Sequence, residues 1–493
     1  MTGLLNHAWF RIGAAVVALG AVAGAGVLAG TPAPDTPDAE TRVEKVVVAR
    51  AALGCPTVGA DRATTTAVNA AVPALPEGTP VAPGRPTPVE VRKLGAGVLG
   101  TIKQRGRGIT VSEGVTPVPV AVRATGPLAA GTAATVTSTA SSGVNRGMAS
   151  TACATPSAEF WFAGAGSAVG RRDVLVLTNL DDANASVDVT FYGAAGQLEN
   201  SAGNGIVVRG RSQAEVYMRT VVPGQRELAM RVVSTGGRIA AAIRDNVTTG
   251  PVPAGVDWLS PSAEPARETV LPAVAPGAGA RVLTVVNPGD LQTTATVNVL
   301  SRNGRFRPAG RDTIVIPAGG IRSVRLDEAA RGEAAAVAVS AEEPVFAALR
   351  IIDQKNTDFA SLGSTTRLTG PSYLVLPPHA DPATLILTAP GDAGSAHVEL
   401  RSANGSVVSR RTVKVKAGSS TALPLAASKI STYLAVSPGE GGGVAGAVTL
   451  TPSTKPAADA VHGVAAWPLT TSLVFRAQLG AHPDVRAALR PAG

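Results

Sequence analysis

A repeated pair of strand patterns constrains the fold of this 493-residue chain more than any other feature. Residues 174–196 read VLVLTN, a short polar loop and SVDVTFYGAAG, so that apolar and polar residues alternate after the loop. Residues 282–304 repeat this order, with the same spacing between the asparagine before the loop and the turn glycine. A third copy at 384–405 keeps the glycine but has Ala389 in place of the asparagine. Two period-2 runs around a short turn predict a β-hairpin, so the chain contains at least three copies of one β module.

The strand patterns on either side of each hairpin complete a larger unit. One strand precedes each copy, as EFWFAG, TVLPAV or YLVLPP, and two further hairpin patterns follow it. This gives about seven strands in roughly 105 residues, which is typical of an immunoglobulin-like β-sandwich. The 55 Gly and 37 Pro residues also favour short strands joined by turns. We therefore predict an all-β fold of tandem immunoglobulin-like β-sandwich modules. A β-propeller-like arrangement is the alternative, because two blades of about 50 residues would also fill one unit.

The patterns divide the chain into eight segments. Residues 45–155 are less regular and contain a Pro-rich stretch, and we interpret them as a degenerate fourth unit. The predicted segments are a cytoplasmic N-terminus (1–11), a transmembrane or signal segment (12–30), a Pro-rich linker (31–44), an irregular N-terminal β region (45–155), β module 1 (156–264), β module 2 (265–369), β module 3 (370–455) and C-terminal strands with a tail (456–493).

The N-terminal segment indicates where the protein resides. Residues 12–30 carry no charge, and about 19 helical residues span roughly 28 Å, close to the hydrocarbon core of a bilayer. Arg11 precedes this stretch and the acidic sequence DTPDAE follows it, so the positive-inside rule places the rest of the chain outside the membrane. We expect a single-pass cell-membrane protein with an extracytoplasmic C-terminal region. Since small residues end the stretch, secretion after signal cleavage is the alternative.

Two cysteines, Cys55 and Cys153, lie beyond this segment. In an oxidising compartment an isolated pair of cysteines predicts a disulfide. Closing a loop of about a hundred residues stabilises the folded state by about 4–5 kcal/mol in the chain-entropy model.

The charge balance suggests classes of partner. Lys and Arg number 44 against 35 Asp and Glu, giving a net charge of +9. This excess favours an anionic cell-wall polymer or another envelope component, beside the membrane that the N-terminal helix would contact. Aromatic residues make up 3% of the chain, so few rings are available for base stacking, which argues against nucleic acid.

Motifs that carry chemistry are weak or incomplete. GAGVLG at 95–100 has the glycine spacing of a dinucleotide-binding loop, but no helical pattern follows it. The five histidines are isolated, and His379 near Asp381 is interpreted as a turn residue. The carboxylate pairs Asp181–Asp182 and Glu342–Glu343 are assigned to solvated hairpin loops. We thus predict no catalytic, cofactor-binding or metal-binding residues, no cofactor, and a protein that is not an enzyme.

Three tryptophans stand near the ends of the units. Trp161, Trp258 and Trp467 occur in EFWFAG, GVDWLSP and VAAWPLT. Large aromatic side chains dominate core and interface packing, so we expect them to wedge successive modules together.

The run CATPSAEFWFAGAG at 153–166, the following LVLTNLDDANASVDVTFYGAAG and the strand GGRIAAAIRD resemble a large actinobacterial family of exported proteins, the domain of unknown function DUF5719. The resemblance covers about residues 45–475. It implies an actinobacterial envelope protein, and family members tend to be encoded near a cell-wall glycosyltransferase. The leading hypothesis is a non-enzymatic, membrane-anchored binding or scaffold protein. The alternative is an accessory subunit of a cell-wall polymer-assembling enzyme, or a weak hydrolase.

Overall fold

The computed structural model describes residues 43–59, 63–112, 118–330, 332–379, 383–451 and 463–479. The predicted segments 1–11 and 12–30 and most of the linker 31–44 lie outside these residues. Within the described residues, no helix is long and apolar enough to span a membrane.

The chain divides into two compact units. The first consists of residues 1–46 and 476–493, and its described part belongs to a two-stranded sheet of β1 (Val43–Val47) and β35 (Phe475–Leu479). The second unit, residues 47–475, contains almost all of the described strands and is considered by itself below.

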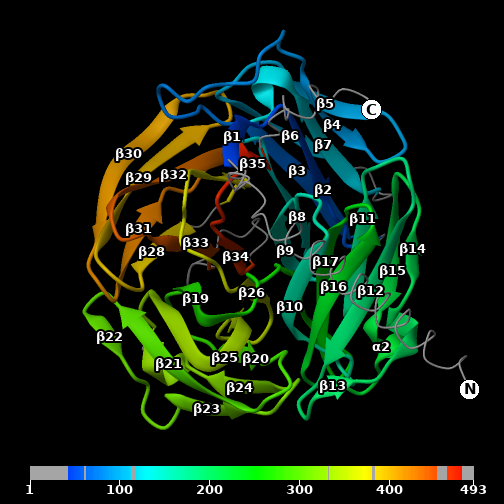
Figure 1. Cartoon of the computed structure of the whole chain (residues 1–493), viewed down its shortest axis with the longest axis vertical. Coiled ribbons are helices and arrows are strands. Elements are labelled where there is room, and N and C mark those ends of the chain that lie inside the picture. Colours follow the sequence, from blue (N-terminus) through cyan, green and yellow to red (C-terminus); the bar gives the residue numbers. More distant parts are fainter. Residues whose placement is uncertain are drawn as a thin grey trace, which may run out of the picture. The chain divides into compact units, whose positions relative to one another are not determined.

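The second unit consists of four modules, each made of two antiparallel sheets (Figure 1). In the first module, the sheet orders are β2-β7-β4-β5 and β6-β3-β8-β9. This module occupies the region whose sequence pattern is irregular. Its strands are β2 (Arg50–Cys55), β3 (Thr64–Val72), β4 (Val89–Lys93), β5 (Val98–Ile102), β6 (Arg107–Ser112), β7 (Val120–Thr125), β8 (Ala133–Ala140) and β9 (Gly147–Ala152).

The second module has the sheets β10-β16-β12-β13 and β15-β11-β17-β18, with β14 also paired to β12. Its elements are β10 (Glu159–Ala165), β11 (Val174–Asn179), β12 (Ala185–Tyr192), β13 (Gln197–Leu198), β14 (Ile206–Val208), β15 (Ser212–Tyr217), α2 (Met218–Val221), β16 (Leu228–Gly236), β17 (Ala240–Thr249) and β18 (Val252–Leu259).

The third module differs because one long strand, β25, belongs to both of its sheets. The first part of β25 pairs with β19 and β21, and the second part pairs with β20 and β26. The hairpin predicted around AAVAVSAEEPVFAALRI is therefore wrong: the chain stays extended there and crosses from one sheet to the other. The elements are β19 (Ala266–Val274), β20 (Arg281–Val286), β21 (Thr293–Ser301), β22 (Gly304–Phe306), β23 (Thr313–Ile316), β24 (Ile321–Arg325), α3 (Asp327–Ala330), β25 (Ala335–Ile352) and β26 (Phe359–Gly363).

The fourth module has the sheets β27-β32-β29-β30 and β31-β28-β33-β34. Its final strand, β34, pairs with β33 and so belongs to this module. The strands are β27 (Ser372–Leu376), β28 (Ala383–Ala389), β29 (Gly394–Ser402), β30 (Val407–Val415), β31 (Ser419–Leu425), β32 (Thr432–Gly441), β33 (Ala445–Leu450) and β34 (Ala465–Pro468).

Each module has its own apolar core, to which both of its sheets contribute. Alternation along β12 turns Val187, Val189 and Phe191 inward, where they pack in one cluster with Leu175 and Leu177 of β11. Such two-layer packing is the defining property of a β-sandwich. The two strands of each repeat lie in opposite sheets and do not pair with each other, so the hairpins predicted for the three repeats are wrong. In a propeller, each blade is a single four-stranded sheet, so the paired sheets favour the sandwich reading.

Strand β11 is buried on both faces. Leu175 and Leu177 face the core of the second module, whereas Val174 and Val176 pack with Val58 of the first module. The uninterrupted apolar run VLVL is thus explained by the packing of the second face of β11 against the first module.

The modules contact one another in a closed order. The last strand of each module, β9, β18, β26 or β34, contacts the last strands of the modules before and after it, and β34 returns to β9 (Figure 1). Trp161 packs between the second and third modules with Phe346, and Trp258 packs with Val58 and Ala149 of the first module. Trp467 lies in the core of the fourth module, where Met148 of the first module joins it. All three tryptophans are buried, as predicted.

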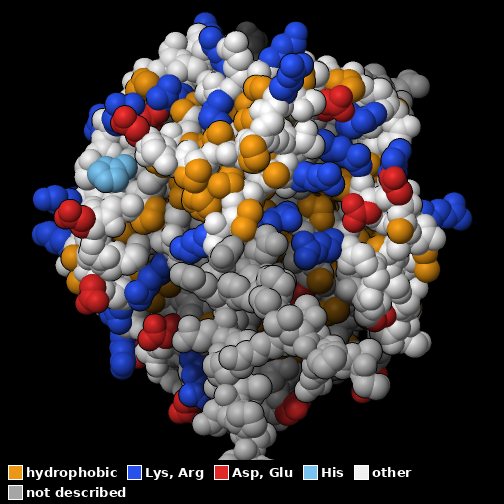
Figure 2. Space-filling view, turned by 45° about the horizontal axis from the view of Figure 1, so that its top comes forward, with side chains coloured by type: hydrophobic (Ala, Val, Ile, Leu, Met, Phe, Trp, Pro, Cys, Tyr) orange, Lys and Arg blue, Asp and Glu red, His pale blue; other side chains and the backbone are white. Residues whose placement is uncertain are grey.

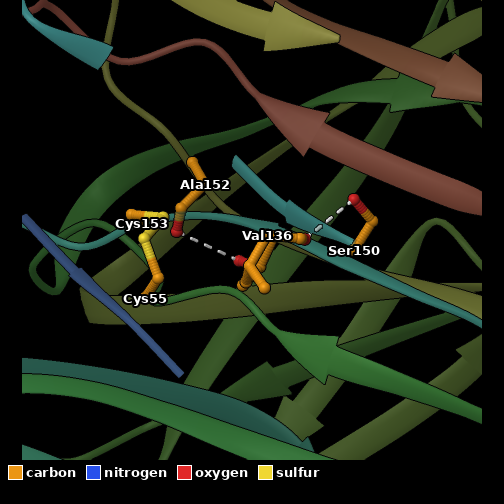
Figure 3. The surroundings of a disulfide bond; sticks show 6 residues. Cys55, Val136, Ser150, Ala152 and Cys153 are labelled. Atoms are coloured by element: carbon orange, nitrogen blue, oxygen red, sulfur yellow. Dashed lines mark hydrogen bonds between the residues drawn. A yellow bond between two sulfur atoms is a disulfide. The ribbon is translucent and has the colours of Figure 1, made fainter. Parts of the chain in front are cut away.

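The predicted disulfide is present. Cys55 at the end of β2 is bonded to Cys153, which follows β9, with 4.4 Å between the two Cα atoms. Both half-cystines lie in the apolar core, near Val136 of β8 and Ser150 of β9 (Figure 3). Since β2 and β9 belong to different sheets, the bridge links the first and last strands of the first module.

Candidate binding cleft

The weak motifs of the sequence have structural roles. GAGVLG at 95–100 forms the turn between β4 and β5 and the start of β5, so no helix follows its glycines. The Nδ1 atom of His379 lies 2.8 Å from the Pro377 carbonyl oxygen, whereas Asp381 is outside the described residues. No group of three possible metal-ligating side chains gathers among the residues that the structure describes.

The two carboxylate pairs differ in their positions. Asp181 and Asp182 occupy the exposed loop between β11 and β12, as predicted, and Asp182 is paired with Arg211. Glu342 and Glu343 instead lie inside the long strand β25, so their assignment to a hairpin loop is wrong. Strand β25 continues through them because it pairs with both sheets of its module.

Two buried carboxylates lie where the last strands of the four modules meet. Asp358, just before β26, accepts backbone hydrogen bonds from Met148 of the first module (3.3 Å) and Val464 of the fourth (2.9 Å). Asp257 of β18 accepts such bonds from Ser150 (3.2 Å) and Ser361 (2.9 Å). Each aspartate therefore joins its own module to two others.

Burial raises the pKa of both Asp257 and Asp358 well above the ordinary value, and the charge of Asp257 acts in the same direction on Asp358. Burial outweighs the backbone hydrogen bonds, which favour the ionised form. Perturbed carboxylates occur at catalytic sites, but here both oxygens of Asp257 and Oδ2 of Asp358 accept from backbone N–H groups of neighbouring modules, while Oδ1 of Asp358 has no partner among the described residues. The arrangement is that of a structural junction.

A cleft between the first and fourth modules offers an open surface for a ligand. It consists of two cavities of about 660 and 500 Å³, which share Ala74, Leu75, Pro76 and Arg401 as wall residues. We call this feature the arginine cleft, since its wall carries five arginines and two glutamates: Arg105, Arg107, Arg401, Arg410, Arg411, Glu77 and Glu399.

The Pro-rich segment of the first module forms one wall, and Arg105 holds it in place. The guanidinium of Arg105 donates to the carbonyl oxygens of Pro73 (2.8 Å), Pro127 (2.6 Å) and Ala130 (2.9 Å). Burial lowers the pKa of Arg105 from its ordinary value. Arg105 is thus mainly a support for the loop, and the ligand-facing charge comes from its neighbours.

Two glycine turns bring the modules together at the cleft. Gly106 (φ 79°) precedes β6, and Gly405 (φ 89°) lies in the turn between β29 and β30. A Cβ atom on Gly405 would lie 2.8 Å from the carbonyl oxygen of Gly106, so only glycine permits this approach. Arg107 then donates to the carbonyl oxygen of Asn404 across the junction.

The fourth module supplies the remaining charged side chains. Arg401 and Arg410 both donate to Glu399, and Arg410 does so at 2.7 Å. Although partial burial acts to raise it, these hydrogen bonds hold the pKa of Glu399 below its ordinary value. Arg411 makes no ion pair among the described residues and is exposed. Its charge is therefore available to a ligand.

The inner wall of the cleft includes Tyr373, whose hydroxyl is buried without a hydrogen-bond partner among the described residues. Burial raises the pKa of Tyr373 to about 12.

On the face shown in Figure 2, Lys and Arg side chains surround a group of apolar side chains. An anionic ligand with some apolar surface matches such a face.

Comparisons with known proteins identify the family. A profile of a family of unknown function, DUF5719, matches residues 107–426, which is more than half of the chain. The chain belongs to the DUF5719 family. A search of curated proteins found no match.

Among solved structures, a match to the DUF5719 chain is an α-L-rhamnosidase from Streptomyces avermitilis in complex with L-rhamnose. The identity is 11% and the TM-score 0.14, with 82% of this chain and 57% of the rhamnosidase chain covered. The chain thus spans little more than half the length of that enzyme.

Proposed function

We propose that this DUF5719 protein is a non-enzymatic binding or scaffold protein of the cell envelope, held outside the cytoplasm by its N-terminal apolar segment. The Cys55–Cys153 disulfide supports export, because such bonds persist in oxidising compartments. Arg11 before residues 12–30 and the acidic residues after them support a single-pass anchor. The Ala-, Val- and Arg-rich composition fits an actinobacterial source.

The arginine cleft is the surface through which the protein would bind an anionic envelope polymer. The observation that carries this proposal is the convergence of five arginines and two glutamates from two modules on adjoining cavities. Arginine is suited to carboxylate and phosphate groups because its planar guanidinium offers several donors. The buried carboxylates at the junction of the four modules, Asp257 and Asp358, accept hydrogen bonds from backbone N–H groups, which supports binding over catalysis.

The test is sedimentation of the purified protein with an anionic polymer, first with isolated wall material and then with polyglutamate. Many weak arginine contacts are screened over about 8–10 Å at physiological ionic strength, so we expect binding at about 50 mM NaCl and its loss by a few hundred millimolar. Failure to sediment at the lowest salt would reject the proposal.

Matched variants locate the binding surface. Arg107→Gln with Arg411→Gln should weaken polymer binding by about 2- to 30-fold, since each exposed contact is worth about 0.2–1 kcal/mol. Arg219→Gln, on α2 of the second module, also removes an exposed arginine and serves as the control. Equal losses in the control would show that net charge, and not the cleft, attracts the polymer.

We also propose that the modules are immunoglobulin-like sandwiches arranged in tandem. Each contains two antiparallel sheets around one apolar core, and each spans about a hundred residues, as in that architecture. Superposition of an experimental structure on immunoglobulin-type domains tests this: a different strand order would refute it.

A further inference from the structure

A second cavity, separate from the arginine cleft, lies between the second and third modules. Its volume is about 240 Å³, and its wall includes residues of β10, β17, β20, β24, β25 and β26. Pockets for drug-sized ligands measure about 300–1,000 Å³, so this cavity fits one small molecule.

Four charged side chains form the back of this cavity. Arg171 and Arg350 both donate to Oδ2 of Asp245, Arg171 at 2.9 Å, and Arg171 also donates to Asp173 at 2.8 Å. Both carboxylates are fully buried, whereas the two guanidiniums keep 17% and 16% of their side-chain surface exposed. Because both arginines line the cavity, this exposed fraction lies toward it.

The arginines have more donors than the carboxylates use. Within the described part of the chain, Arg350 uses Nη2 alone, on Asp245 and on the Gly164 carbonyl oxygen at 3.4 Å. Its Nε and Nη1 atoms donate to no described residue, and the same holds for Nη1 of Arg171. None of these atoms is sealed from the cavity. They remain available for oxygen atoms of a ligand.

Local electrostatics also favour a negative ligand. Burial lowers the pKa of Arg350 well below its ordinary value, and the neighbouring charge of Arg171 acts in the same direction. The charge of Asp173 acts in the opposite direction but does not restore the ordinary pKa of Arg350. Arg226 stands exposed at the wall with no ion pair among the described residues, while Glu227 beside it opposes its charge. Burial also raises the pKa of Asp173, which favours its neutral form. With Asp173 protonated, the two guanidiniums face the single carboxylate of Asp245, and one negative group placed against Arg350 would balance the charge.

Hydroxyl groups complete the wall. The hydroxyls of Thr284 and Ser323 are hydrogen-bonded to each other at 2.9 Å, and Ser361 contributes a third. Ala163, Ala348 and Leu349 supply apolar surface between them. Guanidinium donors, hydroxyls and small apolar patches together match a compact molecule that carries both a carboxylate and hydroxyls.

We propose that this cavity binds a small hydroxylated carboxylate, the size of a single sugar acid, with its carboxylate on Arg350 and Arg171. The ligand would lie across the junction of the second and third modules, because Arg171 precedes β11 whereas Arg350 belongs to β25. Binding would therefore strengthen the contact between these modules.

The test measures binding to the purified full chain by titration calorimetry at constant ionic strength. The probes are glucuronate, glucose, which has the same ring without the carboxylate, and inorganic phosphate, an oxyanion without the ring. We expect glucuronate to bind and to raise the unfolding temperature, since a ligand that binds the folded state stabilises it. Glucose should bind at least 10-fold more weakly, and so should phosphate.

Variants separate recognition from folding. Arg350→Met should abolish glucuronate binding, but it also unpairs part of a buried charge cluster. Arg226→Gln removes an exposed arginine without a partner, and we expect a loss of about 2- to 5-fold with an unchanged unfolding temperature of the free protein. Arg219→Gln is the charge-matched control and should change neither quantity.

Equal binding of glucose and glucuronate would overturn carboxylate recognition, and equal binding of phosphate would overturn the role of the hydroxyls. Absence of any heat or thermal shift with glucuronate at millimolar concentration would overturn the proposal as a whole. None of these outcomes depends on polymer binding at the arginine cleft.

Discussion

The substitution Gly147→Ala tests whether the protein's stability depends on the glycines that surround Asp358 at the junction of the four modules. Gly147 begins β9 with φ 119°, and a Cβ atom there would lie 2.5 Å from Oδ1 of Asp358. A Cβ atom on Gly255 would lie 2.9 Å from Oδ1 of Asp358, and a Cβ atom on Gly463 would lie 2.8 Å from its Oδ2. The carboxylate thus fits because three of the neighbouring positions lack side chains.

Two costs add in Gly147→Ala. A non-glycine residue at positive φ costs about 1–3 kcal/mol, and forcing a methyl group into a packed site costs about 1–3 kcal/mol more. Gly84 provides the control, because its φ is 118° and nothing lies within 4 Å of its Cβ position. Gly84→Ala should therefore show the backbone cost alone, reduced by about 0.4–1 kcal/mol through the less flexible unfolded chain.

Denaturant unfolding of both variants measures the difference, with the midpoint and slope fitted separately. We expect Gly147→Ala to be less stable than Gly84→Ala by at least about 1 kcal/mol. In the double variant Gly147→Ala with Asp358→Ala, the steric part should disappear, so the two losses should not add. Equal stability of the two single variants would refute the reasoning.

Three further predictions follow from the buried groups and the topology. Because burial raises the pKa of Asp257 and Asp358, their protonated carboxyl groups contribute fully to the free energy of unfolding below about pH 4, and this contribution declines as the pH rises through the raised pKa values. In the variant Asp358→Asn, the free energy of unfolding should therefore change less with pH. Cys55→Ser with Cys153→Ser should lower the free energy of unfolding by about 4–5 kcal/mol, and a loss below about 1 kcal/mol would contradict a role in stability. Non-reducing mass spectrometry should find the two cysteine peptides linked. Protease applied to wall-stripped cells should digest the chain beyond residue 31, and full protection would overturn export.

The β content and the strands of the three repeats could be predicted because they depend on alternation along the chain, which is a local property. VLVLTN and VLTVVN form β11 and β20, and the strands that follow them are β12 and β21. The two strands of each repeat do not pair with each other: β11 pairs with β15 and β17, whereas β12 pairs with β16. The predicted hairpins are wrong because alternation along the chain does not determine which strands pair. The long strand β25 escaped prediction because Glu342 and Glu343 resemble a polar turn. Its pairing with both sheets is a tertiary constraint that no local pattern carries.

The arginine cleft could not be predicted, since its residues come from segments about 300 positions apart in the chain. Arg107 and Asn404 meet only because the fourth module returns to the first. The net charge of +9 indicated an anionic partner but no location. The Pro-rich stretch was visible in the sequence, yet its role as a cleft wall depends on the carbonyl contacts of Arg105.

The positions that break the repeat carry the most information about how the modules assemble. One module has aspartate where three have glycine. The corresponding stretches, in or just before the last strands, are Gly147-Met-Ala-Ser, Gly255-Val-Asp-Trp, Asp358-Phe-Ala-Ser and Gly463-Val-Ala-Ala. Two positions further on, Asp257 likewise replaces an alanine. Identical modules would place either four carboxylates or none at the junction, and four buried like charges would repel one another strongly. With one aspartate at each of the two positions, the repulsion is limited to that between Asp257 and Asp358, and both still accept backbone hydrogen bonds from neighbouring modules.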